Sequence, residues 1–302
     1  MKNSDSVWGL ESRTTGRKVF VAFNYALISL LTIVSLIPLW NIFSMSFSSS
    51  EFVAAGEVFL WPKGFTWESY HYILVNPDFY KSLWISVERT VLGIVLTMMC
   101  TILTAYPLSR SRIEFRARPF FVWYFLITML FGGGLIPWFM VVKWTGMYDN
   151  LGALVIVPAV QVFNILILMN FIRNLPRELE ESAYLDGAGH LRTLISVLLP
   201  LCKPALATLV LFTFVYHWNS WFDGFLFMSR KEHYPLQTYL YTVLTVPDTS
   251  HLTPDMLKQF ANLDSRSIKA AEIFVSTLPI LLLYPFLQKY FTKGIVLGSV
   301  KG

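Results

Sequence analysis

The sequence has little charge and few cysteines. Only 14% of its 302 residues are Asp, Glu, Lys or Arg, while 55% are hydrophobic; in ordinary soluble domains about a quarter of the residues are charged. Such a chain has too few charges to cover a water-facing surface, so we expect a lipid bilayer as its solvent. Cys100 and Cys202 lie far apart in the sequence and give no support to a disulfide framework. The net charge of +5 does not indicate nucleic acid as a partner, because Lys and Arg occur in short clusters between apolar runs.

The motifs of several enzyme classes are also absent. No G-x-x-x-x-G-K-[ST] phosphate loop occurs, so ATP hydrolysis by this chain is excluded. There is no H-E-x-x-H, no cysteine-rich metal spacing and no G-x-S-x-G. We therefore expect no catalytic residue, no metal site and no cofactor bound by this chain. An intramembrane enzyme that uses Asp223 or the pair Glu88 and Arg89 is an alternative, but for that pair we favour a structural role, by snorkelling or by pairing with a neighbouring helix.

Six apolar runs are long enough to cross a membrane as helices. About 20 residues are needed to span roughly 30 Å of hydrocarbon, and the runs are continuous rather than alternating, which favours helices over a barrel. The first run follows Arg17 and Lys18; it is too long for a signal peptide, so we expect it to remain as an anchor. The runs cover residues 19–43, 82–108, 119–142, 151–172, 205–228 and 271–291. The fold class predicted is an all-α integral membrane protein.

The distribution of Lys and Arg predicts the orientation of these spans. The side that holds both termini carries about twice as many Lys and Arg as the other, which makes it the cytoplasmic side. Two long connections, residues 44–81 and 229–270, then lie outside. The first is rich in aromatic residues, as is typical of an interfacial aromatic belt; a surface for an extracytoplasmic partner is the alternative.

One polar segment, ELEESAYLDGAGHLRTLISVLLPL at residues 178–201, interrupts the apolar pattern. The acidic residues at its start favour a helix N-terminus, and Gly187 favours a helix stop. We expect a first helix over 179–186 and a second over 189–198 that ends at Pro200. Together they would form a knob that protrudes into the cytoplasm, where small residues let another protein approach closely. An amphipathic connector on the membrane surface is the alternative.

The spacing in this segment resembles the EAA loop of ABC importer permeases. That motif reads E-A-A, three residues, Gly, nine residues, Ile, any residue, Leu-Pro; here Ser182 replaces Ala and Val197 replaces Ile. The resemblance implies a coupling helix that docks on an ATP-hydrolysing subunit. The residues it assigns to coupling are Glu181, Ser182, Ala183, Asp186, Gly187, Leu199 and Pro200.

Other stretches resemble carbohydrate-type permeases similar to those of the maltose system, in particular the branch for complex oligosaccharides. They are the tail KYFTKGIVLGSVKG and the segments GGGLIPWFMVVKWTGMYDN and WNSWFDGFLF. The resemblance implies a type I ABC importer permease fold with six transmembrane helices. Its expected parts are a cytoplasmic tail over 1–18, a permease domain over 19–291 with the coupling loop at 173–204, and a cytoplasmic tail over 292–302.

The resemblance also implies a set of partners in a bacterial inner membrane. These are a second homologous permease, two ATP-binding subunits that hold ATP and Mg, and an extracytoplasmic solute-binding protein that delivers an oligosaccharide. A permease for a non-sugar solute, or a secondary transporter with its own coupling-ion site, is the alternative.

Polar and aromatic residues in the fifth and third runs are candidates for the sugar path. They are Trp218, Asn219, Trp221 and Asp223 in the fifth run, and Leu135 and Pro137 in the third. At helical spacing Trp218, Trp221 and Phe225 would form one stripe, and Asn219 and Asp223 would share a face. Three glycines before Leu135 favour a bent helix near the outer side. The alternative for both groups is packing against lipid or against neighbouring helices.

Overall fold

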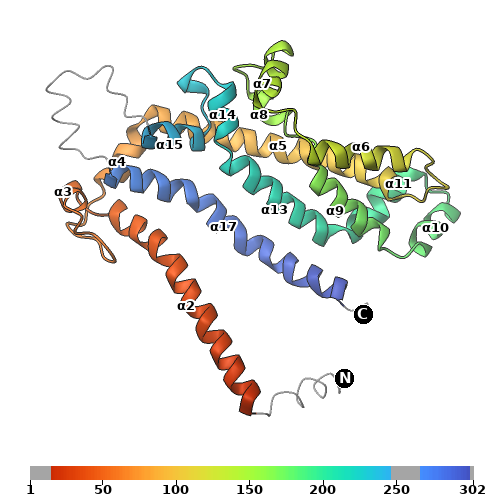
Figure 1. Cartoon of the computed structure of the whole chain (residues 1–302), viewed down its shortest axis with the longest axis horizontal. Helices are drawn as coiled ribbons and strands as arrows, with labels where there is room; N and C mark the ends of the chain where they lie inside the picture. Colours follow the sequence, from red (N-terminus) through yellow and green to blue (C-terminus); the bar gives the residue numbers. More distant parts are fainter. Residues whose placement is uncertain (1–14, 246–265, 300–302) are drawn as a thin grey trace. The chain divides into compact units, whose positions relative to one another are not determined.

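The computed structural model describes residues 15–245 and 266–299, and gives side-chain surroundings as far as Pro285. Within these residues all regular structure is helical apart from a β-bridge between Ser48 and Phe65, which confirms the all-α prediction (Figure 1). Three helices are individually long and apolar enough to cross a membrane, or up to five spans result if each of two bent helix pairs counts as one. Parts of the expected tails (1–14 and 300–302) and of the second long connection (246–265) lie outside the described residues.

The first of two compact units comprises the described residues up to Val75 and the start of α17 (Arg266–Ser299), up to Val275. Its long helix α2 (Thr15–Ser46) presents an apolar 18-residue window that is 0% buried inside the chain. The connection that follows α2 is tied back to it, because Trp40 Nε1 donates to the carbonyl of Leu60 at 2.7 Å. The rest of its own unit therefore leaves this apolar window of α2 uncovered.

Aromatic residues gather in the same connection, around α3 (Ser50–Ala54) and α4 (Glu68–Val75). The ring of Phe47 stacks on Phe65 with centroids 5.6 Å apart and meets Trp67 edge-on at 5.0 Å. Phe65 and Trp67 nevertheless remain more than half exposed. Both the interfacial belt and the partner surface stay predictions for this cluster.

The second unit comprises residues 76–245 and the part of α17 from Ser276 on. It is built on α5 (Pro77–Ser109). The side chain of Asn76 accepts from the backbone N–H of Asp78 at 3.0 Å, and Pro77 occupies the first turn, so the helix start is well defined. Its 33 residues extend about 50 Å, enough to cross a bilayer.

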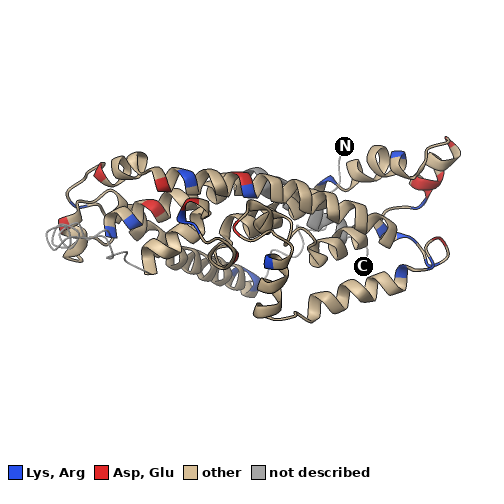
Figure 2. Cartoon of the chain, turned by 90° about the horizontal axis from the view of Figure 1, so that it is seen from above, with Lys and Arg blue, Asp and Glu red and all other residues tan. Residues whose placement is uncertain are grey.

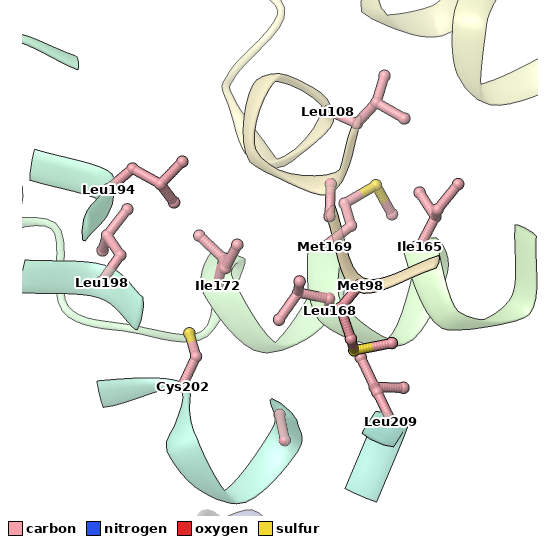
Figure 3. Packing of buried hydrophobic residues seen from close by; sticks show 12 residues of the cluster. Met98, Leu108, Ile165, Leu168, Met169, Ile172, Leu194, Leu198, Cys202 and Leu209 are labelled. Carbon is pink, nitrogen blue, oxygen red and sulfur yellow. The ribbon is translucent and has the colours of Figure 1, made fainter. Parts of the chain in front are cut away.

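The apolar core of this unit lies between α5, α9 (Val162–Arg173) and α13 (Lys203–Asn219). Figure 3 shows side chains from the three helices converging, with Met98 of α5 close to Leu168 of α9 and Leu209 of α13. Close approach of α5 and α13 requires a glycine at one point: a Cβ on Gly93 would lie 2.5 Å from the His217 ring. The core thus forms where helices distant in sequence meet.

The third apolar run is bent, as its glycines predict. It forms α6 (Arg118–Leu130) and α7 (Leu135–Trp144), which meet at an angle of 113°. Gly134 between them has φ +88°, a conformation that glycine adopts without steric cost.

The prediction of a continuous fourth span over residues 151–172 is wrong. The segment instead forms α8 (Leu151–Val155), a non-helical stretch, and then α9. Pro158 lies in that stretch, where it lacks an N–H to continue a helix. With 12 residues, α9 extends only about 18 Å.

The fifth run is also interrupted. The helix α13 ends at Asn219, and Ser220 adopts extended backbone before α14 (Phe222–Phe227) begins. A 3-10 turn, η2 (Lys231–His233), and α15 (Leu236–Thr245) follow. Charged residues concentrate in connections and near helix ends, and the long helices are largely free of them (Figure 2), as membrane burial requires.

Candidate functional site

The first helix of the expected coupling loop is α10 (Glu178–Leu185), and it ends at a glycine. Gly187 has φ +78°. The N–H of Ala188 bonds to the carbonyl of Ala183 at 2.9 Å, and that of Gly187 to Tyr184 at 3.0 Å. These two bonds define a Schellman motif, which needs a left-handed residue at this position. The helix stop predicted at Gly187 is confirmed.

The second helix of the loop ends at Leu201, one residue after the expected Pro200. It runs through α11 (His190–Thr193), a π-helical turn η1 (Leu194–Leu198) and α12 (Leu199–Leu201), and then bends by 83° into α13. In the π turn the N–H of Leu199 bonds five residues back, to Leu194. Proline lacks an N–H and its ring crowds the carbonyl four residues earlier, so the wider turn accommodates Pro200 just before the helix ends.

The two helices of the loop differ in burial, which corrects the expectation of a knob that protrudes as a whole. Leu194 and Leu198 are buried in the core, close to Ile172 of α9 (Figure 3). In α10 only Ala183 is buried. One face of the second helix, with Leu194 and Leu198, therefore packs on the core, while its other face, with Leu191 and Ile195, stays exposed like α10.

The residues assigned to coupling lie mostly on the surface. Glu181, Ser182, Asp186, Gly187 and Pro200 are exposed, Leu199 is half-buried and Ala183 is buried. Large apolar side chains are exposed beside them: Leu185 has 89% of its surface accessible, and Leu191 and Ile195 are more than half exposed. A group of exposed apolar residues on a polar loop is typical of an interaction surface.

A charged contact joins α10 to the end of α5. Arg110, directly after α5, forms an ion pair with Glu180, and the guanidinium lies 4.3 Å from the ring centroid of Tyr106. Burial works against the charged form of Arg110, but the hydrogen bond and charge of Glu180 outweigh it and raise the pKa of Arg110. Arg110 therefore stays charged across the physiological pH range.

The candidate sugar-path residues of the fifth run do not share one helix face. Because α13 ends at Asn219 and Ser220 is extended, helical spacing is lost between Trp218 and Trp221. Trp218 is buried and its Nε1 donates to the carbonyl of Ser276 at 3.0 Å, while Asn219 is exposed. Trp221 is partly exposed and stacks on Tyr241, with centroids 4.1 Å apart. The single stripe and the shared face predicted from spacing are therefore wrong.

Asp223 is fully engaged within the chain. Its carboxylate pairs with Arg89 of α5 and accepts from Ser220 Oγ and from the backbone N–H of Gly224, both at 2.8 Å. Arg89 also donates to the Ser220 carbonyl at 3.1 Å. The structural pairing expected for Arg89 is thus present, across to a neighbouring helix. It leaves the Asp223 carboxylate with little capacity for a sugar hydroxyl.

The candidates in the third run lie at the bend. Leu135 and Pro137 belong to the first turn of α7, and both are exposed within the described chain. They do not meet Asp223, which is buried against α5. Their helix α7 nevertheless packs on α14, because the ring centroids of Trp138 and Phe227 lie 4.8 Å apart.

Sequence reasoning missed one polar cluster. Asp149, which has φ +58°, accepts from Arg230 Nε at 2.7 Å and lies 3.1 Å from Nδ1 of His233. A cavity of about 360 Å³ lies beside them, lined also by Glu88 and Asn150. Burial raises the pKa of Asp149, but hydrogen bonds from Arg230, the Ser229 backbone and His233 outweigh it and lower that pKa below its ordinary value. No spacing signal could have revealed the cluster, because its members are about 80 residues apart.

Metal chemistry has no evident support in the described part of the chain. Among those residues, no three His, Cys, Asp or Glu side chains gather in a way that could hold a metal ion. Cys100 and Cys202 are both free thiols. The residues that stand out are therefore those of the loop and of the buried ion pairs.

Comparison with known proteins places these features in a family. Residues 89–297 match the model of the binding-protein-dependent transport system inner membrane component family. The chain is 37% identical to "Protein LplC" of Bacillus subtilis (strain 168), over 96% of this chain and 97% of that protein. It is 38% identical to the "Polygalacturonan/rhamnogalacturonan transport system permease protein YtcP" of the same organism, over 94% and 99%. Among solved structures, a bacterial ABC transporter involved in the import of the acidic polysaccharide alginate matches with a TM-score of 0.84 and 31% identity, covering 92% of this chain and 98% of that one.

Proposed function

The chain belongs to the family of binding-protein-dependent transport system inner membrane components, and we propose that it forms part of the path by which an oligosaccharide enters the cell. It is a permease subunit of an ABC importer, and ATP is hydrolysed on a separate subunit. Support for an oligosaccharide comes from relatives whose names refer to polygalacturonan, rhamnogalacturonan and maltodextrin transport. Uronic-acid oligosaccharides are the first class to test, since the similar solved structure imports the acidic polysaccharide alginate.

The loop at residues 173–204 is the proposed docking site for the ATP-binding subunit. The supporting observation is the contrast in burial: α10 is exposed and carries apolar side chains such as Leu185, while one face of η1, with Leu194 and Leu198, packs into the core. A docked α10 is therefore continuous with buried structure. An interface of this kind draws most of its binding free energy from a few apolar or aromatic anchors, and Leu185 is the most exposed apolar side chain of the loop.

The remaining partners are proposed on the same basis. A second permease and two ATP-binding subunits would complete the complex, with ATP and Mg held by those subunits and no cofactor held by this chain. An extracytoplasmic binding protein would deliver the sugar to the outer side. Both termini and the coupling loop would then be cytoplasmic, in agreement with the excess of Lys and Arg there.

Reconstitution in proteoliposomes tests the proposal. The chain is combined with a second permease, the ATP-binding subunits and the binding protein, and uptake of radiolabelled oligogalacturonate is measured with and without ATP. We expect uptake that depends on ATP. Uptake of labelled maltodextrin but not of oligogalacturonate would show that the substrate is a neutral oligosaccharide. ATP-independent uptake of any solute would contradict the proposed mechanism.

The docking surface is tested by pull-down of the ATP-binding subunit. Leu185→Asp places a charge at the most exposed apolar position of the loop, so recovery should fall at least tenfold, a loss of about 1.4 kcal/mol of binding free energy. Ile113→Asp is the matched control, because Ile113 is equally exposed but lies outside the loop. Equal recovery of the subunit by both variants would contradict docking through α10.

A further inference from the structure

The exposed helix α10 has little apolar packing to hold it in place. Ala183 is its only buried residue. Its position relative to the rest of the second unit must therefore come mainly from polar contacts. The strongest of these is the ion pair between Glu180 and Arg110, whose side chains are only 14% and 15% exposed.

Arg110 is held from two sides. The carboxylate of Glu180 pairs with one terminal nitrogen, and the ring of Tyr106 lies under the guanidinium at 4.3 Å. A charge-assisted hydrogen bond in a partly buried position is stronger than an exposed one. The planar guanidinium can stack on a ring and bond to a carboxylate at the same time, which a lysine cannot do equally well.

Tyr106 extends the connection to the second helix of the loop. Its hydroxyl donates to the carbonyl of His190 at 3.2 Å and lies 3.4 Å from the hydroxyl of Tyr184. Tyr184 in turn lies 2.9 Å from Nδ1 of His190. The last turn of α5 and the residue after it therefore contact both α10 and the start of α11.

We infer that Arg110 and Glu180 are positioning residues that transmit movement of α10 to the membrane helix α5; the inference rests on the proposed docking of the loop. A partner can shift a conformational equilibrium only through contacts that differ between the two states. The pair joins α10 to the end of α5. Since α5 packs on α9 and α13 along the core, a movement that reaches α5 can reach these helices too. Without the pair, the polar contacts that join α5 to the loop are the weaker ones of Tyr106 with Tyr184 and His190.

Cys100, a half-buried thiol of α5, is a native reporter of this movement. In the assembled complex, the alkylation rate of Cys100 by N-ethylmaleimide is compared with and without ATP plus vanadate. Cys202→Ala removes the other thiol. We expect a change of rate in the reference protein, and we expect that change to fall at least about fivefold in Glu180→Gln and in Arg110→Gln, since coupling between sites is typically about 5- to 150-fold.

Matched controls and a rescue separate coupling from general damage. Glu178→Gln and Arg112→Gln remove exposed charges from the same helix and the same connection, and should leave the ATP-dependent change intact. The exchanged pair Arg110→Glu with Glu180→Arg should recover at least half of it. Recovery of the ATP-binding subunit is measured in parallel for every variant and should stay equal to that of the reference protein.

Three results would overturn the inference. The Cys100 rate of the reference protein could be insensitive to ATP, or Glu180→Gln could respond normally. The third is loss of the ATP-binding subunit in Glu180→Gln, which would assign Glu180 to the docking surface. Failure of the reference protein itself to recover that subunit is a different result, and it would contradict the proposed docking and the inference together.

Discussion

Arg89 of α5 and Asp223 of α14 form an ion pair in which both side chains are buried, at 0% and 7% exposure. The pair holds the non-helical break between α13 and α14 against α5, because Arg89 also donates to the carbonyl of Ser220. Removal of one partner leaves the other charge buried without compensation. These two charges, one in α5 and one in α14, therefore stabilise the packing of the two segments.

Single substitutions in this pair should therefore reduce stability strongly. We expect Arg89→Met and Asp223→Leu each to lower the free energy of unfolding by about 3–5 kcal/mol, and the double variant to lie close to wild type. Denaturant unfolding of the purified protein in detergent measures this, with Glu88→Gln as an exposed control that should change stability by less than about 0.5 kcal/mol. If Asp223→Leu kept full stability but lost about ten- to a hundredfold in transport affinity, Asp223 would instead be a sugar ligand.

Gly187→Val should weaken the coupling loop through backbone strain. A Cβ at Gly187 would meet no atom within 4 Å, so the penalty comes from φ +78°, which costs an L-residue about 1–2 kcal/mol. Gly189→Val is the matched control, because Gly189 has equally open space but φ −76°. Pull-down should recover less ATP-binding subunit with the first variant than with the second. Equal recovery would mean that the helix stop is not needed for docking.

Asp149 should make stability depend on pH in the acid range. Its pKa in the folded protein is lowered by Arg230, the Ser229 backbone and His233, whereas an unfolded Asp titrates at 3.8. A group with a lowered folded pKa contributes stability that is full above its unfolded pKa and is lost as pH falls through the folded one. Asp149→Asn should therefore lower the Tm at pH 6, and this difference should shrink steadily as pH falls below 3.8. A Tm difference that does not change with pH would contradict this.

Cysteine labelling from one side of the membrane tests the orientation. In a background without Cys100 and Cys202, Trp67→Cys should react with an impermeant maleimide added outside, and Arg112→Cys should react only after the cytoplasmic side is opened. His251, also expected outside, lies beyond the described residues. Reaction of position 67 from the cytoplasmic side alone would reverse the assignment.

Composition and periodicity were enough to predict a helical membrane protein, and local backbone chemistry was enough for several details. The stop at Gly187 and the bend before Leu135 follow from residues that act within one turn, because glycine tolerates positive φ wherever it stands. The family resemblance likewise rests on local spacing around Glu181 and Gly187. These features depend on neighbours in sequence, so the sequence alone determines them.

Contacts between distant segments were decided only by tertiary structure. Periodicity placed Trp218, Trp221 and Phe225 on one face, but Arg89 of α5 holds Ser220 and Asp223 in a break that the periodic pattern does not show. In the same way the helix end near Pro200 was expected, but the π turn that precedes it, packed into the core through Leu198, was not. The pairings of Arg110 with Glu180 and of Asp149 with Arg230 join residues 70 and 81 positions apart. Charge and hydrogen-bond partners act over a few ångströms in space, so their identity is fixed by which helices pack together and cannot be read along the chain.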